Sequence, residues 1–157
     1  MLDVGRKKKS VVFFGEYIDV LTILKRCFDV ILVVTEQRKN NKQVKGFCEA
    51  QNINYLEVDD LDEVVPHLPN RSSFGVVASF GLIFKERHIS LFGELYNFHP
   101  GCIHTNRGRH PLPNAIRMHK ETMAVSLHQI TDERIDEGRF VAKVEMAIDY
   151  NESYQDN

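Results

Sequence analysis

The chain has 157 residues, of which 43% are hydrophobic and 27% charged, so it is long and apolar enough for one globular domain rather than a disordered segment. Its formal net charge of −2 gives no general attraction to nucleic acid or anionic lipid. Three cysteines without CxxC spacing, and the lack of a signal-peptide core or of about twenty consecutive apolar residues, favour a cytoplasmic protein without a membrane segment.

A basic run, Arg6-Lys7-Lys8-Lys9, precedes the first predicted strand. Such a run favours a solvated leader over residues 1–9, with a phosphate-contacting arm as the alternative. The sequence shows no internal repeat, linker or low-complexity segment after it. We therefore expect residues 10–157 to form a single domain.

Apolar runs and helical spacing alternate along the rest of the chain. The pattern predicts strands at 10–15, 30–35, 54–58, 74–80, 95–98, 124–130 and 140–148, with helices at 16–27, around 44–50, at 85–92 and at 111–120. This alternation predicts βαβ units with right-handed crossovers. The expected fold is α/β and Rossmann-like, with a mainly parallel twisted sheet flanked by helices, and ligands bind such sheets at the carboxyl ends of their strands.

Polar side chains gather directly after the fifth predicted strand, namely Asn97, His99, His104, Arg107, Arg109 and His110. Three kinds of site could account for this group of side chains: a metal site, an anion-binding loop or an acyl-transfer site. The histidines lack the i, i+4 spacing that aims two imidazoles at one ion, which disfavours a metal. Cys102 lies near histidines, but no nucleophile signature surrounds it.

Alternation along the strand places Asn97 and His99 on the same side of the sheet. An amide beside an imidazole can stabilise the oxyanion that forms when a nucleophile attacks a carbonyl. A nearby carboxylate would keep the imidazole protonated, and the acidic segment 131–138 is the best source of one. Acidic turns between strands are nevertheless mostly solvated hairpins.

Three short motifs, Asn97-Phe98-His99-Pro100, Arg107-Gly108 before Pro111, and Ile135-Asp136-Glu137-Gly138, resemble the signature of the folate-dependent formyltransferases. That family includes enzymes acting on methionyl-tRNA, on glycinamide ribonucleotide and on amino-sugar nucleotides. The resemblance extends from residues 11–15 through 78–83 to the final strand. It implies the formyltransferase fold and a folate-dependent N-formyltransferase.

By this resemblance, Asn97, His99 and Asp136 correspond to the catalytic set, and no metal is implied. The implied formyl donor is 10-formyltetrahydrofolate or its 5-formyl analogue. Its pterin would lie between two loops, and the implied contacts are Phe80, Gly81, Leu82, Ile83, Thr131 and Asp132. An amine would attack the formyl carbon, with the His99 imidazolium and Asn97 stabilising the oxyanion and Asp136 assisting proton transfer.

The chain departs from the family pattern after Pro100, where Gly101-Cys102-Ile103-His104 replaces the usual Ser-Leu-Leu-Pro. The basic cluster that follows, Arg107, Arg109 and His110, is a candidate binding site for an acceptor phosphate, with a solvated or internally paired loop as the alternative. The chain stops soon after the last strand, so we expect the usual C-terminal extension to be lacking.

The amine that accepts the formyl group is predicted only by elimination. Gly15-Glu16-Tyr17 lacks the glycine-rich phosphate loop of a glycinamide ribonucleotide enzyme, and the net charge disfavours tRNA. The prediction is therefore a small phosphate-bearing amine, a nucleotide-linked amino sugar, with no nucleic acid or membrane partner and with a homodimer left open. Formyltetrahydrofolate hydrolysis and a non-catalytic folate- or nucleotide-binding module are the alternatives.

Overall fold

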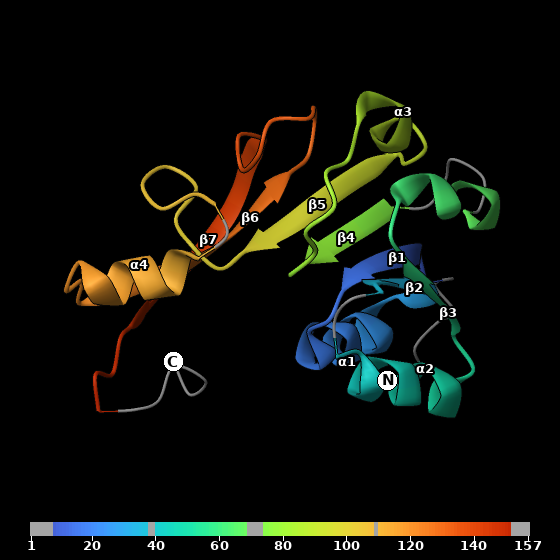
Figure 1. Ribbon diagram of the computed structural model, residues 1–157, viewed down its shortest axis with the longest axis horizontal. Coiled ribbons are helices and arrows are strands. Elements are labelled where there is room, and N and C mark those ends of the chain that lie inside the picture. Colours follow the sequence, from blue (N-terminus) through green and yellow to red (C-terminus); the bar gives the residue numbers. More distant parts are fainter. Residues whose placement is uncertain (1–7, 38–39, 69–73, 109, 152–157) are drawn as a thin grey trace, which may run out of the picture.

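The computed structural model describes residues 8–37, 40–68, 74–108 and 110–151, and it contains a sheet of seven strands in the order β3-β2-β1-β4-β5-β6-β7 (Figure 1). The strands are β1 (Ser10–Gly15), β2 (Asp29–Glu36), β3 (Asn54–Val58), β4 (Phe74–Ala78), β5 (Glu94–His99), β6 (Thr122–Gln129) and β7 (Arg139–Ala147). The helices are α1 (Ile18–Cys27), α2 (Lys42–Gln51), α3 (Glu86–Ile89) and α4 (Pro111–Arg117), with short 3-10 turns η1 (Leu61–Glu63) and η2 (Val65–His67).

Strands β1 to β5 pair in parallel, whereas β6 pairs antiparallel with β5 and β7 antiparallel with β6. The mainly parallel, Rossmann-like sheet predicted from the sequence is therefore confirmed. The strand order reverses between β1 and β4, which lie side by side in the sheet. Ligands of open α/β sheets bind beside such a reversal, outside the carboxyl ends of the strands.

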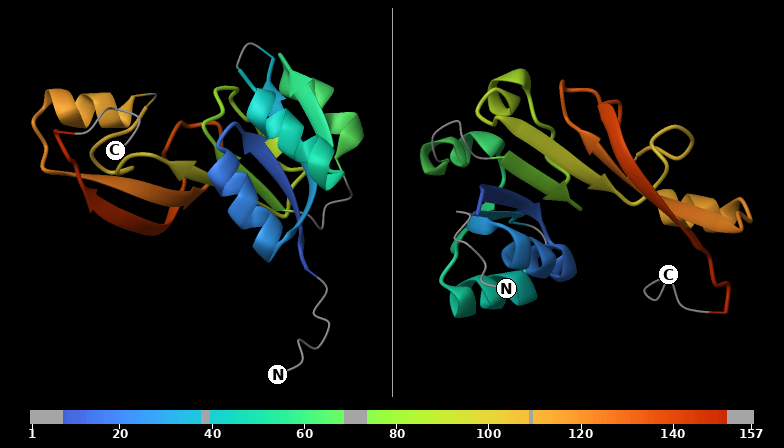
Figure 2. Two further views of the ribbon diagram at one scale, coloured as in Figure 1. Left: turned by 90° about the horizontal axis from the view of Figure 1, so that it is seen from below. Right: turned by 180° about the vertical axis from the view of Figure 1, so that it is seen from behind.

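The buried parallel strands separate two apolar layers, because alternate residues of a strand point to opposite faces. Val11 and Phe13 of β1 pack with α1 and α2 on one face, as Leu21 and Val44 show. On the other face, Val12 and Phe14 pack with the segments that contain η1 and α3. Figure 2 shows helices on both sides of this part of the sheet.

Four predicted elements are shorter in the structure than in the sequence prediction. The helix expected at 16–27 begins at Ile18, and the helix expected at 111–120 ends at Arg117, before His119 with φ of 49°. The strand expected at 74–80 ends at Ala78, because Ser79 adopts a left-handed backbone with φ of 57°. The helix expected at 85–92 is only Glu86–Ile89, because Phe84 and Phe92 on either side of it are drawn into the core. Most of the predicted basic leader, residues 1–7, lies outside the described residues.

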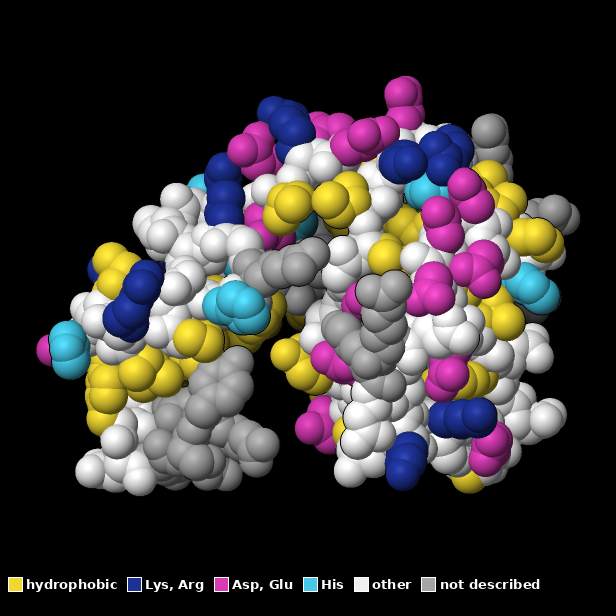
Figure 3. Space-filling model, in the orientation of Figure 1, with side chains coloured by type: hydrophobic (Ala, Val, Ile, Leu, Met, Phe, Trp, Pro, Cys, Tyr) yellow, Lys and Arg dark blue, Asp and Glu magenta, His cyan; other side chains and the backbone are white. Residues whose placement is uncertain are grey.

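The outer end of the sheet forms a lobe of its own. Helix α4 covers the start of β6, and Leu112, Ala115, Met123 and Ile148 make a small separate core there. The space-filling view shows the surface hollowed between this lobe and the part that carries α1 and α2 (Figure 3). Among the helices that the structure describes, none is long and apolar enough to cross a membrane.

Candidate active site

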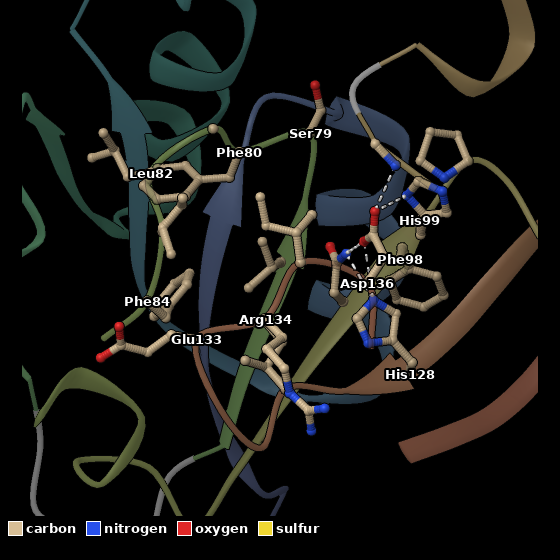
Figure 4. A pocket seen from close by; sticks show the side chains of 18 of the residues that line it. Ser79, Phe80, Leu82, Phe84, Phe98, His99, His128, Glu133, Arg134 and Asp136 are labelled. Atoms are coloured by element: carbon tan, nitrogen blue, oxygen red, sulfur yellow. Dashed lines mark hydrogen bonds and ion pairs between the residues drawn. The ribbon is translucent and has the colours of Figure 1, made fainter. Parts of the chain in front are cut away.

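Three polar side chains meet at the carboxyl end of β5. Asn97 and His99 are the fourth and last residues of that strand, and Asp136 comes from the loop that joins β6 to β7. Asp136 takes a left-handed backbone with φ of 54°, a conformation that aspartate tolerates better than most residues. This turn brings its carboxylate back over β5, where it is buried (Figure 4).

The Asp136 carboxylate is the centre of this group. Its Oδ2 lies 3.4 Å from His99 Nδ1 and accepts a hydrogen bond of 2.9 Å from the backbone N–H of Gly108. Its Oδ1 accepts a 3.4 Å hydrogen bond from the Asn97 amide and lies 3.5 Å from His128 Nε2. The structure thus brings Asn97, His99 and Asp136 together as predicted.

Burial raises the pKa of the Asp136 carboxyl. Its hydrogen bonds with His128 and with the Gly108 N–H, together with the charge of His99, oppose this effect and leave the pKa below its ordinary value. The group is therefore ionised at neutral pH. It supplies a fixed negative charge within the buried cluster.

His99 is held on both ring nitrogens. Nδ1 faces the Asp136 carboxylate, and Nε2 lies 2.8 Å from the backbone carbonyl of Asn106. Both partners are acceptors, so only a ring that carries a proton on each nitrogen satisfies both. Each ring nitrogen of His99 therefore faces a hydrogen-bond acceptor in this conformation.

His128 belongs to the same cluster although the sequence analysis did not single it out. It is buried, and its Nε2 lies 3.1 Å from the Asn97 amide nitrogen. The antiparallel register of β5 and β6 places His128 directly opposite Asn97. Alternation puts His128 on the same side of β6 as Ser126, but only the register shows which strand residue it faces.

A cavity of about 480 Å³ opens beside this cluster, a size that suits a small ligand. Its apolar wall comes from the segment after β4, and its other wall from the loop between β6 and β7 (Figure 4). The predicted folate contacts that line it are Phe80, Gly81, Leu82, Ile83 and Asp132. Thr131 is exposed and does not line it.

The cavity has one apolar wall and one polar wall. Phe80 and Phe84 lie against Phe14 and hold this wall on the core, with ring centroids 5.5 and 5.0 Å from that of Phe14. Ile83 is 53% exposed and lines the cavity, so its apolar side chain is accessible to a ligand there. Polar groups of the 132–136 loop face this wall, and ligand sites combine apolar surface with a few polar groups in this way.

The predicted acceptor-binding cluster is not assembled as one surface. Arg107 donates to the carbonyl of Ile103 and forms an ion pair of 3.0 Å with Glu137, so its guanidinium is paired with groups of the same chain although the side chain is exposed. His110 lines the cavity. Arg109 lies outside the described residues. The phosphate-binding role of these residues stays a prediction, and for Arg107 the structure favours internal pairing.

The described part of the chain contains no group of three or more His, Cys, Asp and Glu side chains placed to hold a metal ion. His104, one of the three histidines weighed as metal ligands, lies against Phe140, with ring centroids 5.7 Å apart.

Gly101, where the chain departs from the family pattern, allows the loop to close over His99. A Cβ atom there would lie 2.5 Å from the Asn106 carbonyl oxygen and 2.6 Å from His99 Nε2. We expect Gly101→Ala to lower the free energy of unfolding by about 1–3 kcal/mol, as overpacking does, measured by urea denaturation. Gly46→Ala is the control, because a Cβ in that helix meets nothing within 4 Å and should stabilise the protein. An unchanged stability for Gly101→Ala would contradict the packing described.

The comparison of sequences gives a partial match. No protein-family model matches the chain. A curated methionyl-tRNA formyltransferase of Pseudothermotoga lettingae is 33% identical over 82 residues, which are 51% of this chain and 26% of that protein. The match thus spans about a quarter of the length of this relative.

The comparison of structures covers nearly the whole chain. Phosphoribosylglycinamide formyltransferase of Bacillus halodurans superposes with a TM-score of 0.79 at 22% identity, over 94% of this chain and 84% of that one. A sugar 3N-formyltransferase, whose structure was determined with dTDP and 5-N-formyltetrahydrofolate, superposes with a TM-score of 0.70 at 24% identity, over 92% and 54% of the two chains. The protein therefore has the formyltransferase fold.

Proposed function

We propose that the protein transfers a formyl group from 10-formyltetrahydrofolate to a primary amine. The observation that carries this proposal is the meeting of Asn97, His99 and Asp136 at the edge of a half-apolar cavity. Hydrogen-bond donors beside a buried carboxylate suit the attack of an amine on a carbonyl carbon. The folate would supply the formyl group, and residues 10–157 would form the catalytic domain.

In this proposal His99 stabilises developing negative charge. In the structure its Nε2–H donates to the backbone carbonyl oxygen of Asn106, which lies in the loop after β5. The formyl oxygen would replace that carbonyl oxygen, which requires the 100–110 loop to shift. The Asn97 amide nitrogen, which faces His128 and Asp136 in the structure, would supply a second donor once one of its two N–H groups turns from these partners to the formyl oxygen.

Asp136 would take part in proton transfer. Its carboxylate, kept ionised by its hydrogen bonds, holds the proton on His99 Nδ1 and lies at the edge of the cavity. An attacking ammonium must lose protons to react, and an ionised carboxylate nearby can accept one directly or through water. His128 would hold Asp136 and Asn97 in place.

The folate would lie against the wall made by residues 80–84. Ile83→Ala should weaken binding of 5-formyltetrahydrofolate about three- to tenfold, because the isoleucine offers exposed apolar surface to the ligand. Titration calorimetry measures this directly. Ile23→Ala is the matched control, since Ile23 is 59% exposed on α1 and does not line the cavity. Absence of binding heat and of a thermal shift with the wild-type protein would contradict the proposed cofactor.

For the acceptor we propose an amine that carries phosphate, with a nucleotide-linked amino sugar as the first candidate. The lack of a glycine-rich phosphate loop at Gly15-Glu16-Tyr17 supports this choice, whereas the structural likeness extends to enzymes of both acceptor types. His110 lines the cavity and would be the first phosphate contact when protonated. Arg109 would assist it, whereas Arg107 would serve by fixing the loop through its ion pair with Glu137.

The test is tetrahydrofolate release from 10-formyltetrahydrofolate, measured with and without a panel of amines. The panel contains nucleotide-linked amino sugars, glycinamide ribonucleotide and methionyl-tRNA. Release that depends on one amine, with that amine formylated, supports the proposal and identifies the acceptor. Release without any amine, accompanied by formate, would show a hydrolase. Binding without release under all conditions would show a folate-binding module.

A further inference from the structure

Strand β7 presents a free edge. It pairs with β6 on one side, and no strand of the described residues pairs with its other side. All nine residues of β7 are exposed, among them Phe140, Val141, Val144 and Met146, the last three at 47%, 64% and 41%. Figure 2 shows β7 as the outermost strand of the sheet. A long apolar edge of this kind is a template for pairing with another strand.

We propose that this edge pairs with β7 of a second copy of the chain, antiparallel, about a two-fold axis at Val144. The strand reads Arg-Phe-Val-Ala-Lys-Val-Glu-Met-Ala from 139 to 147. With the axis at Val144, Lys143 lies opposite Glu145 of the second copy, and Glu145 lies opposite its Lys143. Unlike charges directly opposite each other stabilise a strand pair.

The same register continues an apolar face of the sheet across the interface between the two copies. Within one copy, Met146 lies opposite Met123, Val144 opposite Val125 and Ala142 opposite Leu127. In the two-fold pair, Val144 meets Val144 of the second copy, and Ala142 meets its Met146. Apolar side chains of four neighbouring strands would therefore adjoin on one face of a continuous sheet.

The two neighbouring registers are disfavoured by charge. Moving the axis to Lys143 sets two lysines opposite each other, and moving it to Glu145 sets two glutamates opposite each other. Within one copy Lys143 and Glu145 form an ion pair. In the proposed pair these side chains would form a cluster of four alternating charges. The charge pattern of β7 is therefore complementary to that of β7 in a second copy.

Charge reversal tests the pairing and its register. Sedimentation velocity over a wide concentration range should show a monomer–dimer equilibrium for the wild type. Lys143→Glu and Glu145→Lys should each raise the dimer dissociation constant about tenfold or more, because like charges then face each other. Lys45→Glu makes the same change at an exposed position of α2 and should leave the dimer dissociation constant unchanged. Thermal unfolding checks that each variant is folded.

Mixing the two variants gives the decisive result. Lys143→Glu leaves two glutamates on its β7, and Glu145→Lys leaves two lysines on its own, so every facing pair in the mixed dimer joins one glutamate and one lysine. The mixture should therefore form a heterodimer about as tight as the wild-type dimer. A wild type that stays monomeric at all concentrations would overturn the proposal. A mixture that associates no better than the single variants would overturn it as well.

Discussion

His99→Ala should reduce formyl transfer by about a hundredfold or more, since loss of one preorganised oxyanion donor has this effect. The variant loses the Nε2 donor, which in the structure points at the Asn106 carbonyl 2.8 Å away. The measurement is steady-state tetrahydrofolate release with the amine that gives the highest wild-type turnover. The decrease should fall on kcat/KM for both substrates, because the lost interaction belongs to the transition state.

His67→Ala is the control for this variant, because His67 is exposed in η2, away from the cavity. Its turnover should equal that of the wild type. The binding of 5-formyltetrahydrofolate to His99→Ala should persist, which shows that the fold and the cavity are retained. Turnover in His99→Ala close to the wild-type value would place the catalytic group elsewhere.

Asp136→Asn should reduce turnover by about a hundredfold to ten-thousandfold, the usual range for a positioned acid–base group. The amide keeps the size of the side chain but removes the charge that faces His99 Nδ1, and it offers one accepting oxygen where the carboxylate offers two. Asp29→Asn, an exposed change at the start of β2, is the control. Full activity of Asp136→Asn would show that this carboxylate has no part in proton transfer.

The same variant also tests the electrostatic description of the site. The folded-state pKa of Asp136 is lowered, so the stability that it contributes is present above its unfolded-state pKa and is lost as the pH falls through the folded-state value. At neutral pH we expect Asp136→Asn to be less stable than the wild type by about 1–3 kcal/mol. This difference should shrink below about pH 4. A difference independent of pH would contradict the lowered pKa.

Much of the fold could be predicted because its signal is local. The apolar run Val11 to Phe14 and the helical spacing after it indicate their elements without reference to the rest of the chain, and the structure agrees. Alternation in β5 likewise placed Asn97 and His99 on one side of the sheet. The predictions that were wrong concern element ends. They depend on single backbone angles, as at Ser79, and on how neighbouring phenylalanines pack.

What the sequence by itself determined is the order of the elements and the presence of an amide and an imidazole at one strand end, since both follow from periodicity along the backbone. The tertiary structure decided the rest. It turned Asp136 over β5, set His128 opposite Asn97, and paired Arg107 with Glu137. These contacts join residues about thirty or more positions apart, and strand register and loop closure fix them through packing of the whole chain, which no local pattern records.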